Sequence, residues 1–310
     1  MRAEITTCRG AVLALPTLHE WTVRRTGSVP CDSAALRCGY DAAMAETLRE
    51  ATRLALYDGD KTAFFGVMDE WRADCDGDGL RLELSARGMA ALLLDNEAEA
   101  ASYQRATTAE ILRRHVLPYG IACPAWDEAA AENYLVAGGG SEWAALEGFA
   151  RRSGLTPQFR PDGTLLLRRG HEGAERTLEG VVATSVVWRD KRHGVLSEIV
   201  TVDRGTRAAA SVRNEAFLAR GGCCRRISYA RAGAAQDVRE AAEEQLERSR
   251  RGSETLTVTV AGAFEAEARD ELTVSGCALG VTGRFLVTEL VRRGGAAGET
   301  TTLTLERKQG

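Results

Sequence analysis

The chain has 310 residues, of which 44% are hydrophobic and 27% charged, and its 40 basic and 44 acidic residues give a net charge of −4. These values are typical of a globular protein of about two domains, and they lack the basic excess that nucleic-acid binding requires. No stretch approaches the roughly 18 apolar residues of a membrane-spanning helix, and the amino terminus has no apolar segment typical of a signal peptide. We therefore expect a chain that folds in the cytoplasm, with no specific nucleic acid and no membrane insertion.

The first hundred residues carry the period-two pattern of β-strands. Residues 34–40 predict a short strand, and residues 51–71 predict a hairpin whose turn is Asp58-Gly59. In residues 80–87, "LRLELSAR", leucine alternates strictly with polar side chains, which predicts a strand with one buried face and one solvent-exposed face. Several short strands of this kind favour a small β-barrel over residues 1–100.

Between these strands lies "DCDGDG", which begins like the calcium loop of an EF-hand. Asp74, Asp76 and Asp78 occupy the alternate ligand positions, and Gly79 stands where such loops turn. The last ligand position is Ser85, which cannot supply the bidentate carboxylate, and the flanks predict strands instead of helices. Asp and Gly also build hairpin turns. We therefore predict a turn, with a calcium site at the three aspartates as the alternative.

The middle of the chain changes to a helical period. "TTAEILRRHVLPYGI" predicts a helix capped by Thr107 or Thr108 that ends before Pro118. "SEWAALEGFARRSGL" predicts a second helix, with Ser141 as its N-cap and Gly154 just beyond its end. A hairpin around Pro161-Asp162-Gly163 follows. Helix, helix and hairpin together predict a small α+β domain over residues 101–172.

The last third returns to strands and is predicted to form a second β-barrel over residues 173–310. One long polar helix at 235–251 interrupts it, and its narrow apolar stripe suits a surface or a groove. The predicted strands have half-exposed alternation, as in "TLTVTV". They cover residues 178–190, 194–205, 254–262, 284–293 and 300–308.

Residues that carry catalysis or bind metal are not arranged in any familiar pattern. The eight cysteines include no C-x-x-C pair, and none of the four histidines lies at a ligand spacing from a cysteine pair, so we expect reduced, buried or semi-buried thiols, no metal and no cofactor. The adjacent Cys223 and Cys224 lie in a basic setting that could lower a thiol pKa, although a loop or strand edge with two small buried side chains is the plainer interpretation. A calcium- or thiol-dependent enzyme on a β scaffold is the alternative to a non-enzymatic protein.

The order of these motifs resembles a known family, the central hub proteins of contractile phage tails and related phage-like particles. The resemblance rests on "LYDGDKTAFFGVMDEW", "LRLELSARGMAALLLDN", "TTAEILRRHVLPYGI" and "SEWAALEGFARRSGLTPQFRPDGTLLL", followed by the long helix at 235–251. The segment 262–276 departs from the family pattern, because Gly262, Glu265 and Asp270 are spread differently.

The resemblance implies two tube-protein-like β-barrels, a small α/β domain and a long surface helix. It implies a homotrimer that adapts a sixfold tail tube to a threefold spike or baseplate. The expected partners are further copies of the chain, the tail tube or its initiator, the spike and the baseplate wedges. The expected location is the cytoplasm during assembly and then the tail of a released particle, either a virion or a tailocin-like device. No catalytic residue is implied.

Overall fold

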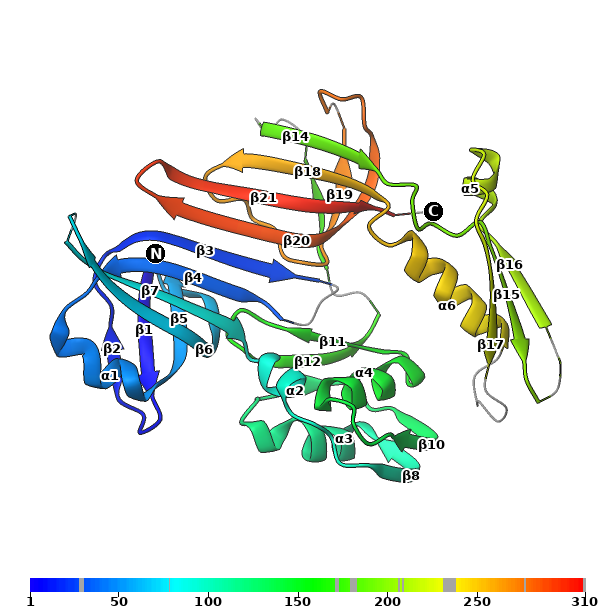
Figure 1. The fold of residues 1–310 in the computed structure, drawn as a ribbon, viewed down its shortest axis with the longest axis horizontal. Coiled ribbons are helices and arrows are strands. Elements are labelled where there is room, and N and C mark those ends of the chain that lie inside the picture. The colour runs from blue at the N-terminus through cyan, green and yellow to red at the C-terminus, as the bar shows by residue number, and fades with distance from the viewer. Residues whose placement is uncertain are drawn as a thin grey trace.

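The computed structural model describes residues 1–27, 31–77, 79–170, 173–178, 183–205, 207, 209–230, 238–275 and 277–308. Within these residues four hydrophobic cores define four packed units. We name them, in chain order, the N-terminal β unit, the α/β unit, the C-terminal β unit and the inserted unit, which interrupts the C-terminal β unit (Figure 1). The β-rich α+β fold class predicted from the sequence is confirmed.

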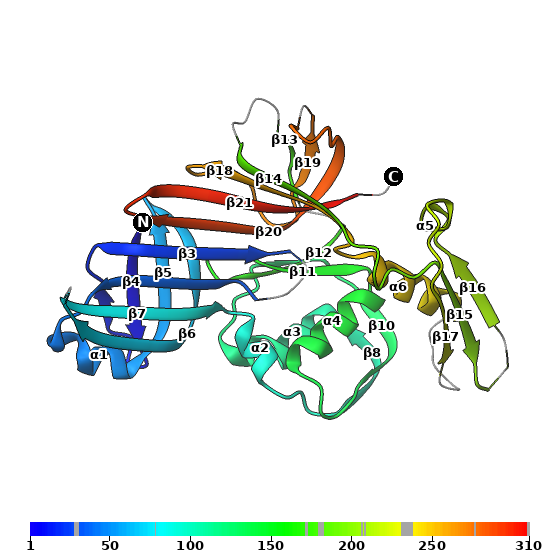
Figure 2. The ribbon, with the colours of Figure 1, turned by 45° about the horizontal axis from the view of Figure 1, so that its top comes forward.

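The N-terminal β unit folds because apolar and polar side chains alternate along its strands. Leu82 and Leu84 are buried while their neighbours along the strand are partly exposed, and the predicted strands at 34–40, 51–71 and 80–87 are confirmed. The strands β1, β2 and β5 cross the direction of β3, β4 and β7 steeply and enclose the core (Figures 1 and 2). Its elements are β1 (Arg2–Thr7), β2 (Val12–Ala14), β3 (Leu18–Thr26), β4 (Ser33–Gly39), η1 (Ala42–Met44), α1 (Ala45–Glu50), β5 (Ala51–Asp58), β6 (Lys61–Asp76) and β7 (Gly79–Gly88).

The α/β unit confirms both predicted helix caps. The Thr107 hydroxyl accepts a hydrogen bond from the Glu110 N–H, and the Ser141 hydroxyl accepts one from the Ala144 N–H. Gly163 has a positive φ of 80° in the predicted hairpin turn. The elements are α2 (Ala91–Asp95), β8 (Ala101–Thr107), α3 (Thr108–His115), η2 (Leu117–Tyr119), β9 (Ala125–Trp126), β10 (Ala130–Val136), α4 (Glu142–Arg152), β11 (Leu155–Phe159) and β12 (Leu165–Arg169).

The C-terminal β unit contains the half-exposed strands that its period-two pattern predicted. Leu256, Val258 and Val260 are buried, while the threonines between them are partly exposed. Its elements are β13 (Glu175–Thr177), β14 (Ala183–Asp190), β18 (Glu254–Ala261), β19 (Glu271–Val274), β20 (Gly283–Gly295) and β21 (Gly298–Arg307).

The inserted unit corrects one sequence-based assignment. The predicted strand 194–205 does form β15, but β15 pairs with β16 and β17 in a separate sheet and not within the predicted second barrel. A period-two pattern shows that a strand has one buried face but not which sheet contains it. Within the helix predicted at 235–251, residues 235–237 lie outside the described residues. The elements are β15 (Glu198–Asp203), β16 (Ala209–Arg213), α5 (Glu215–Ala219), β17 (Arg225–Ala230) and α6 (Val238–Arg250).

Helix α6 covers one face of this small sheet. Ala242 and Leu246 are buried against Leu196 and Ile199, which is the narrow apolar stripe that the sequence predicted. In the part of the chain that the structure describes, no helix is long and apolar enough to span a membrane.

A single large sheet runs through both β units. Its strand order is β14-β18-β21-β20-β3-β4-β7-β6-β5-β1-β2, so the units meet where β20 pairs with β3. In both ribbon views β3 and β20 lie side by side at this point (Figures 1 and 2). The closure of each unit into a barrel and the domain limits 1–100, 101–172 and 173–310 stay predictions.

Candidate functional site

The strand pairing between β3 and β20, which we call the joint, binds the two β units edge to edge. Six antiparallel residue pairs form it, from Glu289 opposite Thr26 to Gly294 opposite Trp21. Arg24 and Glu289 form an ion pair across it, with 3.7 Å between Nη1 and Oε2. Gly294 is required by size, because a Cβ atom there would come within 2.4 Å of the Trp21 ring. The joint is therefore a continuous backbone ladder with its own side-chain packing.

A buried ion pair stands at one end of the joint. The Arg25 Nε lies 2.5 Å from the Asp32 carboxylate, and Asp32 also accepts a hydrogen bond from the Thr26 N–H. Arg25 reaches the Phe159 carbonyl oxygen of the α/β unit and Glu267 of the C-terminal β unit as well. Burial raises the pKa of the Asp32 carboxyl, and the Arg25 guanidinium opposes that rise. One arginine thus connects three of the four units.

The two β units repeat one another in strand register. The hairpins β6–β7 and β20–β21 close on the pairs Asp76–Gly79 and Gly295–Gly298, with two residues between the partners in each hairpin. Both hairpins contain a β-bulge seven residues before the closing pair, at Asp69 and at Thr288. A second bulge recurs in the same way, between Leu18 and Glu20 in the β3–β4 pair and between Ala183 and Ser185 in the β14–β18 pair. Two bulges at matching places indicate one architecture used twice.

The order of the elements predicts two similar β-barrels, but the sequence shows no repeat of fixed period that would align them residue by residue. The register of the two hairpins equates each residue of β6 with the residue 219 positions later in β20. Gly66 then corresponds to Phe285 and Arg72 to Val291, so most side chains differ. The signal that could have found it is the spacing between the hairpin turns, not residue identity.

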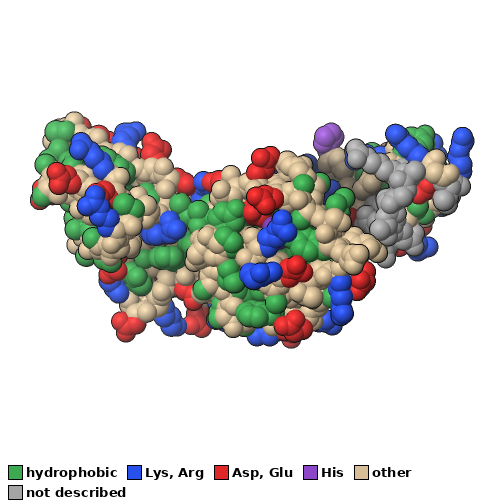
Figure 3. All heavy atoms as spheres, turned by 90° about the horizontal axis from the view of Figure 1, so that it is seen from below, with side chains coloured by type: hydrophobic (Ala, Val, Ile, Leu, Met, Phe, Trp, Pro, Cys, Tyr) green, Lys and Arg blue, Asp and Glu red, His purple; other side chains and the backbone are tan. Residues whose placement is uncertain are grey.

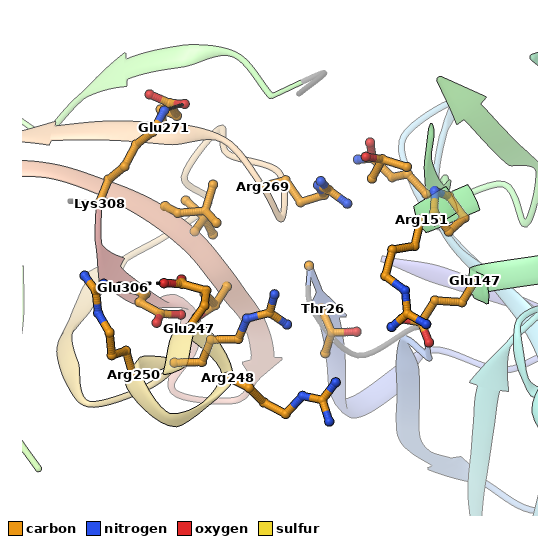
Figure 4. A pocket seen from close by; sticks show the side chains of 18 of the residues that line it. Thr26, Glu147, Arg151, Glu247, Arg248, Arg250, Arg269, Glu271, Glu306 and Lys308 are labelled. Carbon is orange, nitrogen blue, oxygen red and sulfur yellow. Dashed lines mark hydrogen bonds and ion pairs between the residues drawn. The ribbon is translucent and has the colours of Figure 1, made fainter. Parts of the chain in front are cut away.

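A cleft of about 1260 Å³ opens where the α/β, C-terminal β and inserted units meet. Glu147 and Arg151 enter it from α4, while Arg248 and Arg250 enter from α6 (Figure 4). The Arg151 Nη1 and the Glu244 carboxylate bridge the two helices at 3.0 Å. Further lining residues form ion pairs along its walls, namely Arg248–Glu244, Arg250–Glu247, Arg307–Glu254 and Lys308–Glu271.

The lining of this cleft consists largely of paired charges. The described lining residues include neither a cysteine nor a histidine that could serve as nucleophile or base. On the face seen from below, charges of both signs are interspersed over the N-terminal β and α/β units (Figure 3). Paired and mixed charges of this kind suit contact between protein surfaces.

A buried polar network inside the α/β unit was also missed from the sequence. The His115 Nδ1 lies 2.6 Å from the Glu142 carboxylate, and its Nε2 lies 3.0 Å from the Tyr103 hydroxyl. Tyr119 donates to the other oxygen of Glu142 at 2.9 Å, and burial raises the pKa of both tyrosines. His115 is 1% exposed and does not line the cleft described above. The network therefore links α3 to the start of α4.

The predicted hairpin turn at "DCDGDG" is confirmed, since β6 ends at Asp76 and β7 begins at Gly79. Asp74 accepts hydrogen bonds from Arg72 and Arg81, and Arg81 also forms an ion pair with Asp76. The Arg72 guanidinium holds the pKa of the Asp74 carboxyl below its usual value. Asp78 lies outside the described residues. No group of three or more metal-binding side chains occurs among the residues described, and the two described aspartates are paired with arginines.

The eight cysteines are spread over the four units. Cys223 and Cys224 are exposed in the inserted unit, and Cys8 and Cys75 are exposed in the N-terminal β unit, so the expectation of buried or semi-buried thiols is wrong for these four. Burial raises the pKa of the thiols of Cys31, Cys38 and Cys123 to about 11, so these three stay protonated at neutral pH.

Comparison with known proteins finds solved structures with a similar fold. No protein-family model and no curated protein sequence matches the chain. The tail protein from Neisseria meningitidis MC58 is similar in structure, with a TM-score of 0.77 and 16% identity over 99% of this chain and 96% of that one. The 43 kDa tail protein of prophage MuSo2 from Shewanella oneidensis gives a TM-score of 0.75 and 16% identity over 99% and 98%.

A third solved structure belongs to a secretion system. It is an E. coli component of the type VI secretion system, itself described as similar to tail proteins of bacteriophage T4. It gives a TM-score of 0.56 and 14% identity over 94% of this chain and 74% of that one. The resemblance to tail and baseplate proteins is thus confirmed at the level of the fold, which this chain shares with phage tail proteins along nearly its whole length.

Proposed function

We propose that this chain is the structural hub of a contractile tail or tailocin-like particle, a homotrimer that adapts a sixfold tail tube to a threefold spike or baseplate. The observation that carries the proposal is the repeat of one strand architecture in two β units that are joined edge to edge by β3 and β20. Three copies of a chain with two equivalent units present six such units in a ring, so one molecule satisfies both symmetries. The fold shared with phage tail proteins supports the same role.

The partners in this proposal follow from the two symmetries. The ring of six units faces the tail tube or its initiator, while the three α/β units and the three inserted units face the spike and the baseplate wedges. The chain assembles in the cytoplasm and then resides in the tail of the released particle. Its role is mechanical and not enzymatic, which suits surfaces whose charges are already paired.

Mass measurement tests the proposal directly. We expect light scattering after size-exclusion chromatography to give three times the 33.4 kDa chain mass, and electron microscopy of the particle to show threefold density at the end of a sixfold tube. A chain that stays monomeric over a wide concentration series and is absent from purified particles would contradict the proposal.

A further inference from the structure

We infer that the inserted unit binds a second protein through the uncovered face of its sheet, and that this protein presents apolar side chains surrounded by acidic ones. The inference rests on the proposed function, which places the inserted units against other components of the particle, and it deepens that proposal by naming the surface and the chemistry of one such component. Three observations carry it: an apolar sheet face that no described element covers, arginines around it without ion-pair partners, and a position away from the other units.

The sheet of the inserted unit has one covered face. Ile199 and Val212 pack with the α6 residues Ala242 and Leu246 on that side. Because successive side chains of a strand point to opposite faces, the residues between them lie on the other side, which we call the outer face. The strand register arranges the outer face in three rows of neighbours: Arg213-Glu198-Arg225, Ser211-Val200-Ile227 and Ala209-Val202-Tyr229.

The middle of the outer face is apolar and open to solvent. Ile227 is 53% exposed and Tyr229 is 60% exposed, and neither belongs to any of the four hydrophobic cores. Val200 and Val202 lie beside them on β15 and are partly exposed. Contiguous exposed apolar side chains mark interaction sites, and tyrosine is enriched at the centres of protein interfaces.

Arg225, at one end of the outer face, has no ion-pair partner among the described residues. Its neighbour in the row is Glu198, the one carboxylate of the outer face. The Ser211 hydroxyl donates to Glu198 at 2.8 Å and the Arg213 Nε donates at 3.3 Å, and these two bonds hold the pKa of the Glu198 carboxyl below its usual value. Glu198 is thus already paired with Arg213, and Arg225 acts on it only through its charge.

The other end of the outer face carries two further arginines. Arg204 and Arg207 are exposed in the turn between β15 and β16. The Arg204 guanidinium lies over the Tyr229 ring, 5.6 Å from its centroid. Neither arginine forms an ion pair with a described residue, and the carboxylate of this turn, Asp203, accepts a hydrogen bond from the Gly205 N–H.

Charge complementarity selects an acidic partner. On the outer face and its turn four arginines outnumber two carboxylates, although the whole chain has a net charge of −4. The cleft differs, because Arg151, Arg248 and Arg250 there are paired with glutamates. Unpaired arginines lose their water in an interface without compensation unless the partner supplies carboxylates. Two outer faces of separate copies would bring arginine against arginine, so a second copy is not the expected occupant.

The composition favours a protein over a nucleic acid or a membrane. Sheets that bind single-stranded nucleic acid offer several aromatic rings for base stacking. On the outer face Tyr229 is the single aromatic residue, and its ring already faces Arg204. Surfaces that enter a bilayer interface are typically amphipathic helices, not strands. Tyrosine and arginine around an apolar centre are typical of protein interfaces.

The outer face is accessible in the folded chain. In both ribbon views α6 lies between the sheet of β15, β16 and β17 and the rest of the molecule, so the outer face points away from the other three units (Figures 1 and 2). A partner therefore binds there without displacing any described element.

Photocross-linking in cells that produce the particle tests the inference. The probe is benzoylphenylalanine in place of Tyr229, which keeps an aromatic side chain on the outer face. We expect irradiation to give one dominant adduct with a second protein. Mass spectrometry of the linked peptide should map the adduct to a surface where Asp and Glu surround apolar residues.

Benzoylphenylalanine in place of Leu135 is the matched control. Leu135 is 67% exposed on β10 of the α/β unit, so it is an apolar strand residue of similar exposure that lies outside the outer face. We expect at least about tenfold less adduct with the same protein from this position, because binding energy is concentrated at the centre of an interface.

Charge variants of the Tyr229 probe test the acidic chemistry. Arg204→Glu combined with Arg225→Glu removes no ion pair between described residues, and we expect it to lower the yield of adduct about tenfold by placing like charges opposite each other. Arg204→Lys combined with Arg225→Lys keeps the positive charges and should retain most of the adduct. Equal thermal unfolding of the two double variants shows that a loss is not due to misfolding, and an equal yield from both would contradict an acidic partner.

The outcomes separate this inference from the proposed hub. A trimer within the particle whose Tyr229 probe links no better than the Leu135 probe overturns the inference and leaves the hub standing. An adduct with nucleic acid, lipid, a second copy of this chain or a protein surface without an acidic excess also overturns the inference. An adduct with an acidic protein, from a chain that is otherwise monomeric and absent from particles, supports the binding face and contradicts the hub.

Discussion

The two halves of the large sheet have the same backbone register but different chemistry on their partly exposed face. In the N-terminal β unit the cross-strand pair Arg37–Glu83 is an ion pair with 2.6 Å between Nη2 and Oε1. At the equivalent place in the C-terminal β unit, Thr259 and Thr302 lie opposite each other, and their hydroxyl oxygens are 3.1 Å apart. The bulges and the hairpin closures therefore keep the strand register the same in the two β units, while the side chains on the solvent-exposed face differ between them.

The halves also differ in the connection that follows their first equivalent strand. Residues 27–32 join β3 to β4 and bring Asp32 to the buried Arg25. The corresponding connection from β14 to β18 spans residues 191–253 and contains the whole inserted unit. A loop at a sheet end tolerates insertion because its backbone is not part of the ladder. One loop position thus carries a buried ion pair in one half and a folded unit in the other.

Substitutions in the cores of the two halves have the largest expected effect on the free energy of unfolding. Phe285 is fully buried, and its equivalent Gly66 has no side chain because Phe64 and the Arg87 carbonyl oxygen occupy that space. Phe285→Ala should lower the free energy of unfolding by about 3–5 kcal/mol, and Gly66→Ala by about 1–3 kcal/mol through overpacking. Urea unfolding measures both. A Gly66→Ala variant as stable as the natural chain would contradict the repacking described for this half.

The buried ion pair at the joint comes next. Asp32→Ala leaves the Arg25 guanidinium buried without its main partner, so we expect the free energy of unfolding to fall by about 3–4 kcal/mol. Asp190→Ala is the matched variant, since Asp190 corresponds to Arg25 but is exposed and bound to Arg220 at the surface. Its expected cost is below about 1 kcal/mol. Equal costs for the two variants would show that the Arg25–Asp32 pair does not hold the units together.

The cross-strand pairs on the solvent-exposed face have a smaller expected effect on the free energy of unfolding, and this effect depends on salt. Replacing both Arg37 and Glu83 by threonine copies the pair found in the other half, and we expect a change in unfolding free energy within about 1 kcal/mol. The difference between the natural chain and this double variant should shrink further at 1 M salt, because exposed charges are screened. Denaturant titrations at two salt concentrations measure it, and a loss above 2 kcal/mol would refute the interchangeability of the two pairs.

The smallest expected effect is a change of stability with pH at the contact between Asp58 and Arg292. Asp58 at the end of β5 accepts a hydrogen bond from Arg292 of β20 at 2.8 Å, and this bond holds the pKa of its carboxyl below the usual value. Since the folded pKa is lowered, the stabilisation is present above the unfolded value of about 3.9 and disappears as the pH falls through the folded pKa.

Asp58→Asn should therefore be slightly less stable than the natural chain at pH 7, by less than about 1 kcal/mol because Asp58 is half exposed. The two proteins should converge below about pH 4. Thermal unfolding between pH 3 and pH 7 checks the difference, and a gap that widens toward acid would contradict the lowered pKa.

Local patterns predicted most individual elements. The alternation of leucine with polar residues in "LRLELSAR" predicts β7, and Thr107 and Ser141 predict where α3 and α4 begin. The turn at "DCDGDG" followed from Asp and Gly between two strand patterns. Each of these signals acts over a few residues, through backbone preference and side-chain period.

Assembly of the elements was not predictable in the same way. The strand predicted at 194–205 pairs in a separate sheet and not within the predicted second barrel. The buried contact of His115 with Glu142 joins helices whose sequences reveal no partner. The sequence predicts two like β-barrels but not their residue-by-residue register, because equivalent positions such as Gly66 and Phe285 carry different side chains.

The sequence by itself determined the strands, the helices, their caps and the turns, because these depend on residues a few positions apart. Only the tertiary structure decided that β20 pairs with β3 and that two bulged hairpins are equivalent. Strand pairing is set by which edges meet once the cores of the units have formed, and backbone hydrogen bonds carry no residue identity that a sequence pattern could reveal.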